Sequence, residues 1–134
     1  MVLLAFILWV APSLPQQPSA TVTMKGHYVW IQTPRKQNAV TAVFSPQGRD
    51  AWKVSFHFTW HKKKHVYVGE AQGSLVNGEL EGWVAEEVYG VIYRFKGVSK
   101  NGAFTGSHLQ VQTVEGEDDL LINTGTLAMT RAEP

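Results

Sequence analysis

Apolar and polar side chains alternate along the stretch from Trp52 to Trp60. Every second residue is large and apolar, and Lys53, Ser55, His57 and Thr59 lie between them. A period of two is typical of a β-strand with one face in the core and one face in water. The pattern therefore predicts a half-buried strand at the centre of the chain.

Other short segments rich in β-branched and aromatic residues flank this stretch and are separated by Pro, Gly and Asn. They cover residues 21–32, 39–44, 65–75, 90–96, 103–112 and 120–131. No apolar stripe with helical spacing exceeds two turns, and residues 85–88 form one helical turn at most. We predict an all-β fold, an antiparallel up-and-down meander of about eight to nine strands. A small closed or nearly closed barrel is the favoured closure, and a two-sheet sandwich is the alternative.

Two turn motifs share the pattern Asn-Gly-x-apolar-x-Gly, at residues 77–82 and 101–106. Asn-Gly favours a two-residue type I′ turn, because both central residues need a positive φ. Such turns pair Leu75 with Leu80, Gly73 with Gly82, Ser99 with Phe104, Gly97 with Gly106, and Phe95 with His108. Paired glycines inside strands mark sharp bends, which favour a barrel over a flat sheet.

The lysine-rich turn after Trp60 allows two registers. A four-residue turn at His61–Lys64 pairs Trp60 with His65, Phe58 with Tyr67, and Phe56 with Gly69. A three-residue turn at Lys62–Lys64 pairs His61 with His65 and brings Val66 and Val68 inward, because a slip of one residue reverses the strand. The first register is preferred, since it agrees with the predicted Gly73–Gly82 pair.

The predicted inner face is mostly aromatic. It comprises Trp52, Val54, Phe56, Phe58, Trp60, Tyr67, Leu75, Leu80, Val84, Tyr93, Phe95, Phe104 and His108. One interpretation is a core filled by its own side chains, as in other small barrels. The other is a pocket lined by Phe58, Trp60, Tyr67, Tyr93 and His108, of which the last three join a ring to a hydrogen-bonding tip.

Composition and motifs exclude several kinds of chemistry. The net charge of +1 and the pI of about 8.0 give no field that would attract nucleic acid. There are no cysteines, hence no disulfides or thiolate zinc sites. His57, His61 and His65 have a spacing of four residues, which would suit a metal site on a helix but not on a strand, and lysines flank two of them. No metal, cofactor or catalytic motif is predicted.

The first 20 residues differ from the rest of the chain. An apolar run from Val2 to Ala11 precedes a Pro-rich segment, and the first basic residue is Lys25. The run is shorter than the ~20 residues that cross a bilayer, and its length suits a signal peptide. We therefore predict a signal peptide or disordered leader at residues 1–20, a single β-barrel domain at residues 21–134, export to a secreted or periplasmic location, and no stable membrane span in the mature chain. The alternative is that the run forms a first buried strand.

The predicted meander resembles the lipocalin-like and avidin-like barrels in architecture alone. Gly26-His27-Tyr28 stands where lipocalins carry Gly-x-Trp, so the resemblance implies no ligand. From the residues themselves we expect a non-enzymatic barrel that binds a small apolar or aromatic ligand. One alternative is an isomerase or cyclase that uses His108 with a carboxylate at the barrel mouth, from Glu86 or Glu87. Another is a structural or self-associating domain that works through the outer residues Val66, Val68 and Trp83.

Overall fold

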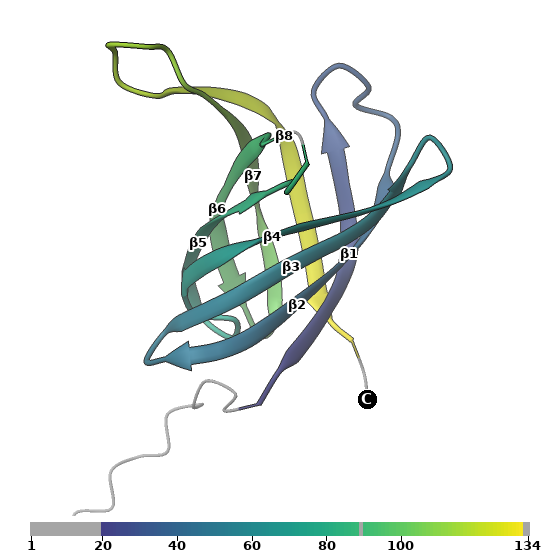
Figure 1. Ribbon diagram of the computed structural model, residues 1–134. Helices are drawn as coiled ribbons and strands as arrows, with labels where there is room; N and C mark the ends of the chain where they lie inside the picture. The colour runs from purple at the N-terminus through teal and green to yellow at the C-terminus, as the bar shows by residue number, and fades with distance from the viewer. Residues whose placement is uncertain (1–19, 89, 133–134) are drawn as a thin grey trace, which may run out of the picture.

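The computed structural model describes residues 20–88 and 90–132, which fold into eight antiparallel strands without a helix. The strands are β1 (Val22–Trp30), β2 (Asn38–Gly48), β3 (Ala51–Trp60), β4 (Lys63–Gly73), β5 (Gly78–Ala85), β6 (Ile92–Lys100), β7 (Ala103–Gln112) and β8 (Leu120–Arg131). Each strand pairs with the next, and β8 pairs with β1, so the sheet closes (Figure 1). The predicted all-β meander and its barrel closure are confirmed, and the sandwich alternative is wrong.

The predicted leader lies, except for Ala20, outside the described residues, and it stays a prediction. Within the described part of the chain, no helix is long and apolar enough to cross a membrane.

Because the strands alternate in direction, their connections gather at two ends of the barrel (Figure 1). The β2–β3, β4–β5 and β6–β7 connections share one end with the start of β1 and the finish of β8. We call this the closed end. The β1–β2, β3–β4, β5–β6 and β7–β8 connections form the opposite, open end.

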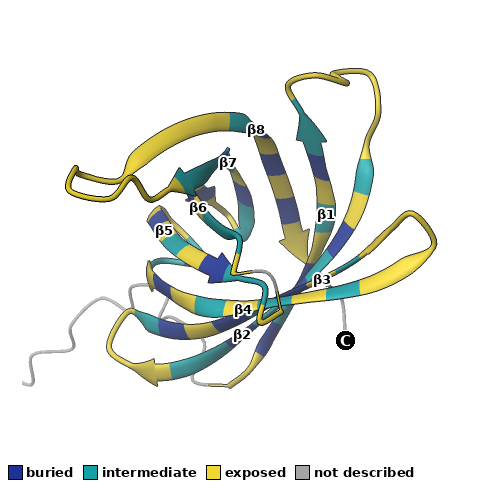
Figure 2. Ribbon diagram, turned by 45° about the horizontal axis from the view of Figure 1, so that its top comes forward, coloured by how far each residue is buried: buried dark blue, intermediate teal, exposed yellow. Residues whose placement is uncertain are grey.

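The closed end is filled by side chains from the inner faces of the strands. Met24, Phe44 and Phe104 are completely buried there. Leu75, in the β4–β5 loop, is 3% exposed, and the indole Nε1 of Trp52 donates to the Gly73 carbonyl at 3.1 Å. Figure 2 shows the resulting alternation of buried and exposed residues along β8. For this half of the barrel, the packed-core interpretation is correct.

The second Asn-Gly turn has the predicted geometry. Asn101 and Gly102 have φ values of 52° and 80°, and the Ser99–Phe104, Gly97–Gly106 and Phe95–His108 pairs all form. A Cβ atom on Gly97 would lie 2.1 Å from the Thr105 carbonyl oxygen. The paired glycines therefore allow the two strands to approach and bend, as expected.

The first Asn-Gly motif does not form a two-residue turn, so the predicted Leu75–Leu80 and Gly73–Gly82 pairs are wrong. Gly73 pairs with Leu80 instead, and residues 74–77 form a longer loop. The Ser74 hydroxyl accepts hydrogen bonds from the backbone N–H groups of Val76 and Asn77, at 3.1 and 3.0 Å. The Asn77 side chain accepts from the Asn101 N–H at 3.0 Å, which joins the two loops at the closed end. These contacts stabilise the longer loop, and it carries Leu75 into the core.

Both predicted registers of the β3–β4 hairpin are wrong, because its turn has only two residues. His61 and Lys62 have φ values of 49° and 65°, and Trp60 pairs with Lys63. Phe56, rather than Phe58, therefore pairs with Tyr67. The shift from the preferred register is two residues, which keeps every side chain on its predicted face. Val66 and Val68 accordingly point outward and are 46% and 39% exposed.

Candidate functional site

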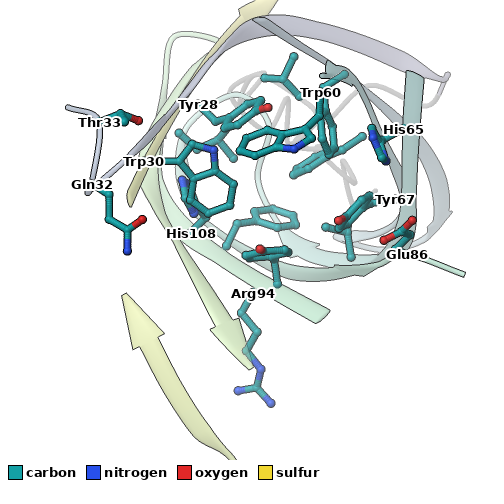
Figure 3. Close-up of a pocket in the computed structure, with 17 residues that line it drawn as sticks. Tyr28, Trp30, Gln32, Thr33, Trp60, His65, Tyr67, Glu86, Arg94 and His108 are labelled. Carbon is teal, nitrogen blue, oxygen red and sulfur yellow. The ribbon is translucent and has the colours of Figure 1, made fainter. Parts of the chain in front are cut away.

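The open end of the barrel contains a cavity of about 530 Å³. Its lining side chains are largely aromatic and apolar (Figure 3). They are Tyr28, Trp30, Gln32, Thr33, Val40, Phe56, Phe58, Trp60, His65, Tyr67, Val84, Glu86, Tyr93, Arg94, Phe95, His108 and Leu127. The volume is within the ~300–1,000 Å³ of typical small-molecule sites. The barrel is therefore packed at one end and hollow at the other.

The structure brings the five site residues predicted from the sequence together around this cavity. Phe58 and Trp60 come from β3, Tyr67 from β4, Tyr93 from β6 and His108 from β7. His108 is 8% exposed, whereas Trp60 is 39% exposed at the rim. Their inward orientation follows from the alternation in each strand. Their role in ligand binding stays a prediction.

Two lining residues from β1, Tyr28 and Trp30, were not among the predicted site residues. Trp30 contacts several other aromatic side chains of the cavity wall. Its ring makes edge contacts with Trp60, Tyr93 and His108, at centroid distances of 5.8, 5.9 and 5.1 Å. The sequence carried a signal for both, since Met24, Gly26, Tyr28 and Trp30 alternate along β1. The alternation alone does not show which face of β1 is the inner one, and only the pairing of β1 with β8 identifies it.

Tyr28 and Trp30 each present a buried polar atom without a partner. Neither the Tyr28 hydroxyl nor the Trp30 indole Nε1 has a hydrogen-bond partner within the described part of the chain. The Tyr28 side chain is only 8% exposed. A buried group without a partner costs about 1–3 kcal/mol. Both atoms are covered by neighbouring groups, so a ligand in the cavity would remove this cost only with a rotation of the ring that turns the polar atom toward the ligand.

The three tyrosines of the cavity are neutral at physiological pH. Burial raises the pKa of Tyr28 and Tyr93 above the ordinary value of 10.0. Burial, together with the nearby Glu86 carboxylate, raises the pKa of Tyr67 to about 12. Glu86 also hydrogen-bonds to the Tyr67 hydroxyl. Each phenol therefore keeps its proton and can donate a hydrogen bond.

His108 is held by contacts with its own chain. Its Nε2 lies 3.1 Å from the Val29 carbonyl oxygen, and its Nδ1 lies 2.6 Å from the Thr124 hydroxyl. A carbonyl can only accept, so Nε2 carries a proton. Thr124 is the extra residue of a β-bulge, because His108 pairs with Gly125 while Leu109 pairs with Asn123. The bulge places the Thr124 hydroxyl beside the His108 imidazole. The hydroxyl oxygen also lies 3.0 Å from the backbone carbonyl oxygen of His108.

The position of His108 predicts a pH dependence of stability. Burial lowers its pKa below the ordinary 6.5, although the hydrogen bond to Val29 opposes the shift. The unfolded chain therefore takes up a proton near pH 6.5, before the folded protein does. The resulting stabilisation is complete above pH 6.5 and is lost as the pH falls toward and through the folded-state pKa. The slope should reach at most about 1.4 kcal/mol per pH unit.

Urea unfolding at a series of pH values measures this slope. His108→Gln keeps a polar side chain but cannot titrate in this range, so it should show a flatter profile between pH 6.5 and the folded-state pKa. Identical profiles for the variant and the original protein would contradict the assignment.

Of the two carboxylates considered in the enzyme alternative, Glu87 is exposed and does not line the cavity, and Glu86 does not meet His108. Glu86 lines the cavity, but Figure 3 shows it across the cavity from His108. The Glu86 side chain bonds to Tyr67, and both nitrogens of His108 contact backbone or hydroxyl groups of the chain. In residues 20–88 and 90–132, no cluster of three potential metal-ligating side chains occurs.

The outer residues considered for self-association are exposed on the barrel wall. Trp83 on β5 is 41% exposed, and Val66 and Val68 lie on the outer face of the neighbouring β4. Their side chains point away from the barrel interior and line no part of the open-end cavity.

Comparison with known proteins gives no relative. No protein-family model matches the chain, and no curated protein or solved structure shows significant similarity to it.

Proposed function

We propose that the protein binds a small, neutral and largely aromatic molecule in the open-end cavity, without acting on it chemically. The observation that carries the proposal is the cavity of about 530 Å³ with its largely apolar and aromatic wall, to which Tyr28 and Trp30 contribute rings that carry the unpartnered Oη and Nε1 atoms. A small-molecule site usually has this composition, an apolar surface with a few fixed polar groups.

The two polar atoms indicate which hydrogen-bonding groups the ligand should carry. An indole N–H only donates, so the ligand should carry an acceptor oxygen or nitrogen where it meets Trp30. The Tyr28 hydroxyl can donate or accept. The many rings of the wall favour a flat ligand, because aromatic pairs gain about 0.5–1.5 kcal/mol beyond the area they bury.

Charge favours a neutral ligand over an anion. A buried carboxylate needs a cationic partner. The guanidinium of Arg94 points away from the cavity in Figure 3, whereas the Glu86 side chain lies at its edge. An anion inside the cavity would therefore meet the Glu86 carboxylate, whereas the lysines of the open end are not part of the lining.

Binding can be tested with 1-naphthol, a neutral aromatic probe with one hydroxyl, followed by quenching of tryptophan fluorescence. We expect saturable binding, and an affinity at least about tenfold higher than that of the 1-naphthoate anion, equivalent to ~1.4 kcal/mol. Absence of saturable binding, or tighter binding of the anion, would contradict the proposal.

Tyr28→Phe separates a binding role from a packing role. Removal of an unpartnered hydroxyl should raise the free energy of unfolding of the unliganded protein by about 1 kcal/mol. The same change should weaken 1-naphthol binding by about five- to tenfold, the value of one hydrogen bond. Urea unfolding and the fluorescence titration measure the two effects. A stability gain with unchanged affinity would show that the hydroxyl does not contact the ligand.

A further inference from the structure

Charged side chains at the open end are divided by sign between its two sides. The β1–β2 and β3–β4 connections, with the start of β4, carry only basic charges. These are Arg35, Lys36, Lys62, Lys63 and Lys64, five of the chain's 12 basic residues. The β5–β6 and β7–β8 connections carry only acidic charges. These are Glu86, Glu87, Glu115, Glu117, Asp118 and Asp119, six of its 11 acidic residues.

The order of the strands around the barrel makes this a division in space. The two basic connections are neighbours, and so are the two acidic ones. Figure 1 shows the β1–β2 and β3–β4 loops on one side of the open end and the β7–β8 loop on the other. All of these charged residues are exposed except Glu86, which is half-buried. The chain as a whole is nearly neutral, with a net charge of +1.

Exposed apolar side chains accompany the charges. Ile31, Trp60, Val88, Val114 and Leu120 lie in or beside the same four connections and are 39–79% exposed. Apolar residues gathered on one surface and flanked by charge are typical of protein interaction sites.

We infer that the open end is a homodimer interface in which two barrels meet mouth to mouth. A two-fold axis along the boundary between the basic and acidic halves places the basic half of each protomer against the acidic half of its partner. A two-fold interface uses the same surface on both subunits, and this surface is complementary to itself in charge. The dimer would bring the two cavities together and shield their openings from water, which goes beyond the proposed binding of a ligand by one barrel.

Sedimentation equilibrium of the unliganded protein at several salt concentrations tests the association without reference to any ligand. At an ionic strength of about 10 mM the Debye length is ~30 Å, and near 1 M it is ~3 Å. We expect a dimer at low salt, with a dissociation constant that rises at least about tenfold across this range. A strict monomer at low salt, or association that salt does not weaken, would overturn the inference.

Two charge-reversed variants provide a sharper test. The first combines Lys62→Glu, Lys63→Glu and Lys64→Glu, and the second combines Glu115→Lys, Glu117→Lys, Asp118→Lys and Asp119→Lys. All seven side chains are exposed and none lines the cavity, so urea unfolding followed by tryptophan fluorescence should show that each variant is folded. Each variant alone should be a monomer, because its two halves now repel those of a second copy.

An equimolar mixture of the two variants should restore the dimer, as a heterodimer of one acidic and one basic open end. Restoration as a one-to-one heterodimer is the result that charge complementarity between the two open ends predicts, and a general loss of solubility or of structure cannot imitate it. Dimerisation of either variant alone, or a mixture that stays monomeric while both variants are folded, would overturn the inference.

Discussion

Replacement of Phe104 with alanine is expected to lower the free energy of unfolding by about 3–5 kcal/mol. The Phe104 side chain is completely buried at the closed end, and its ring meets that of Phe95 edge-on at a centroid distance of 6.3 Å. Alanine would leave a cavity in the part of the barrel that its own side chains fill. Urea unfolding followed by tryptophan fluorescence measures the loss.

Val98→Ala is the matched control, on β6 near the same end but 53% exposed, and it should change stability by less than about 0.5 kcal/mol. Phe104 does not line the open-end cavity, so the folded variant should retain its affinity for 1-naphthol. A small loss of stability for Phe104→Ala would contradict a packed closed end. Loss of probe binding by the folded variant would contradict the separation of the two halves.

Replacement of Trp30 with leucine is expected to weaken 1-naphthol binding by about 10- to 100-fold. The substitution removes a ring that contacts three other aromatic side chains of the wall and an N–H that lacks a partner in the chain. The lost stacking and hydrogen bond together are worth about 1.5–3 kcal/mol. Leucine keeps an apolar side chain at the position, which limits the damage to the fold. A fluorescence titration that follows the probe gives the affinity.

Trp83→Leu is the control for this substitution. Trp83 is 41% exposed, whereas Trp30 is half-buried, and it lies on the outer wall of β5, where it lines no part of the open-end cavity. The Trp83→Leu substitution should leave the affinity for 1-naphthol unchanged. Equal losses in the two variants would locate the probe elsewhere on the barrel.

The sequence predicted the fold because alternation is a local property. Trp52 to Trp60 alternates strictly, and the Asn101-Gly102 turn places its two strands in register, so His108 was correctly assigned to the interior. The β3–β4 hairpin shows that the assignment of side chains to the inner or outer face can be correct even when the turn length is predicted wrongly. Its turn was misjudged, yet Tyr67 still faces the cavity, because a two-residue slip does not exchange the faces of a strand.

What the sequence did not predict depends on contacts between distant residues. Asn77 bonds across to the β6–β7 turn instead of forming a tight turn of its own, and no local pattern carries that information. Tyr28 and Trp30 enter the wall through the pairing of β1 with β8, the last contact that closes the barrel. The bulge at Thr124 likewise appears only once β7 and β8 are aligned.

Whether a neutral aromatic molecule occupies the open-end cavity can be measured most directly by nuclear Overhauser effects between bound 1-naphthol and the protein. We predict cross-peaks from the naphthol ring protons to the ring protons of Tyr28, Trp30 and Phe58, which line the cavity. Cross-peaks to Trp83 on the outer wall without any to these three residues, or the absence of intermolecular cross-peaks at saturating probe, would contradict the proposed site.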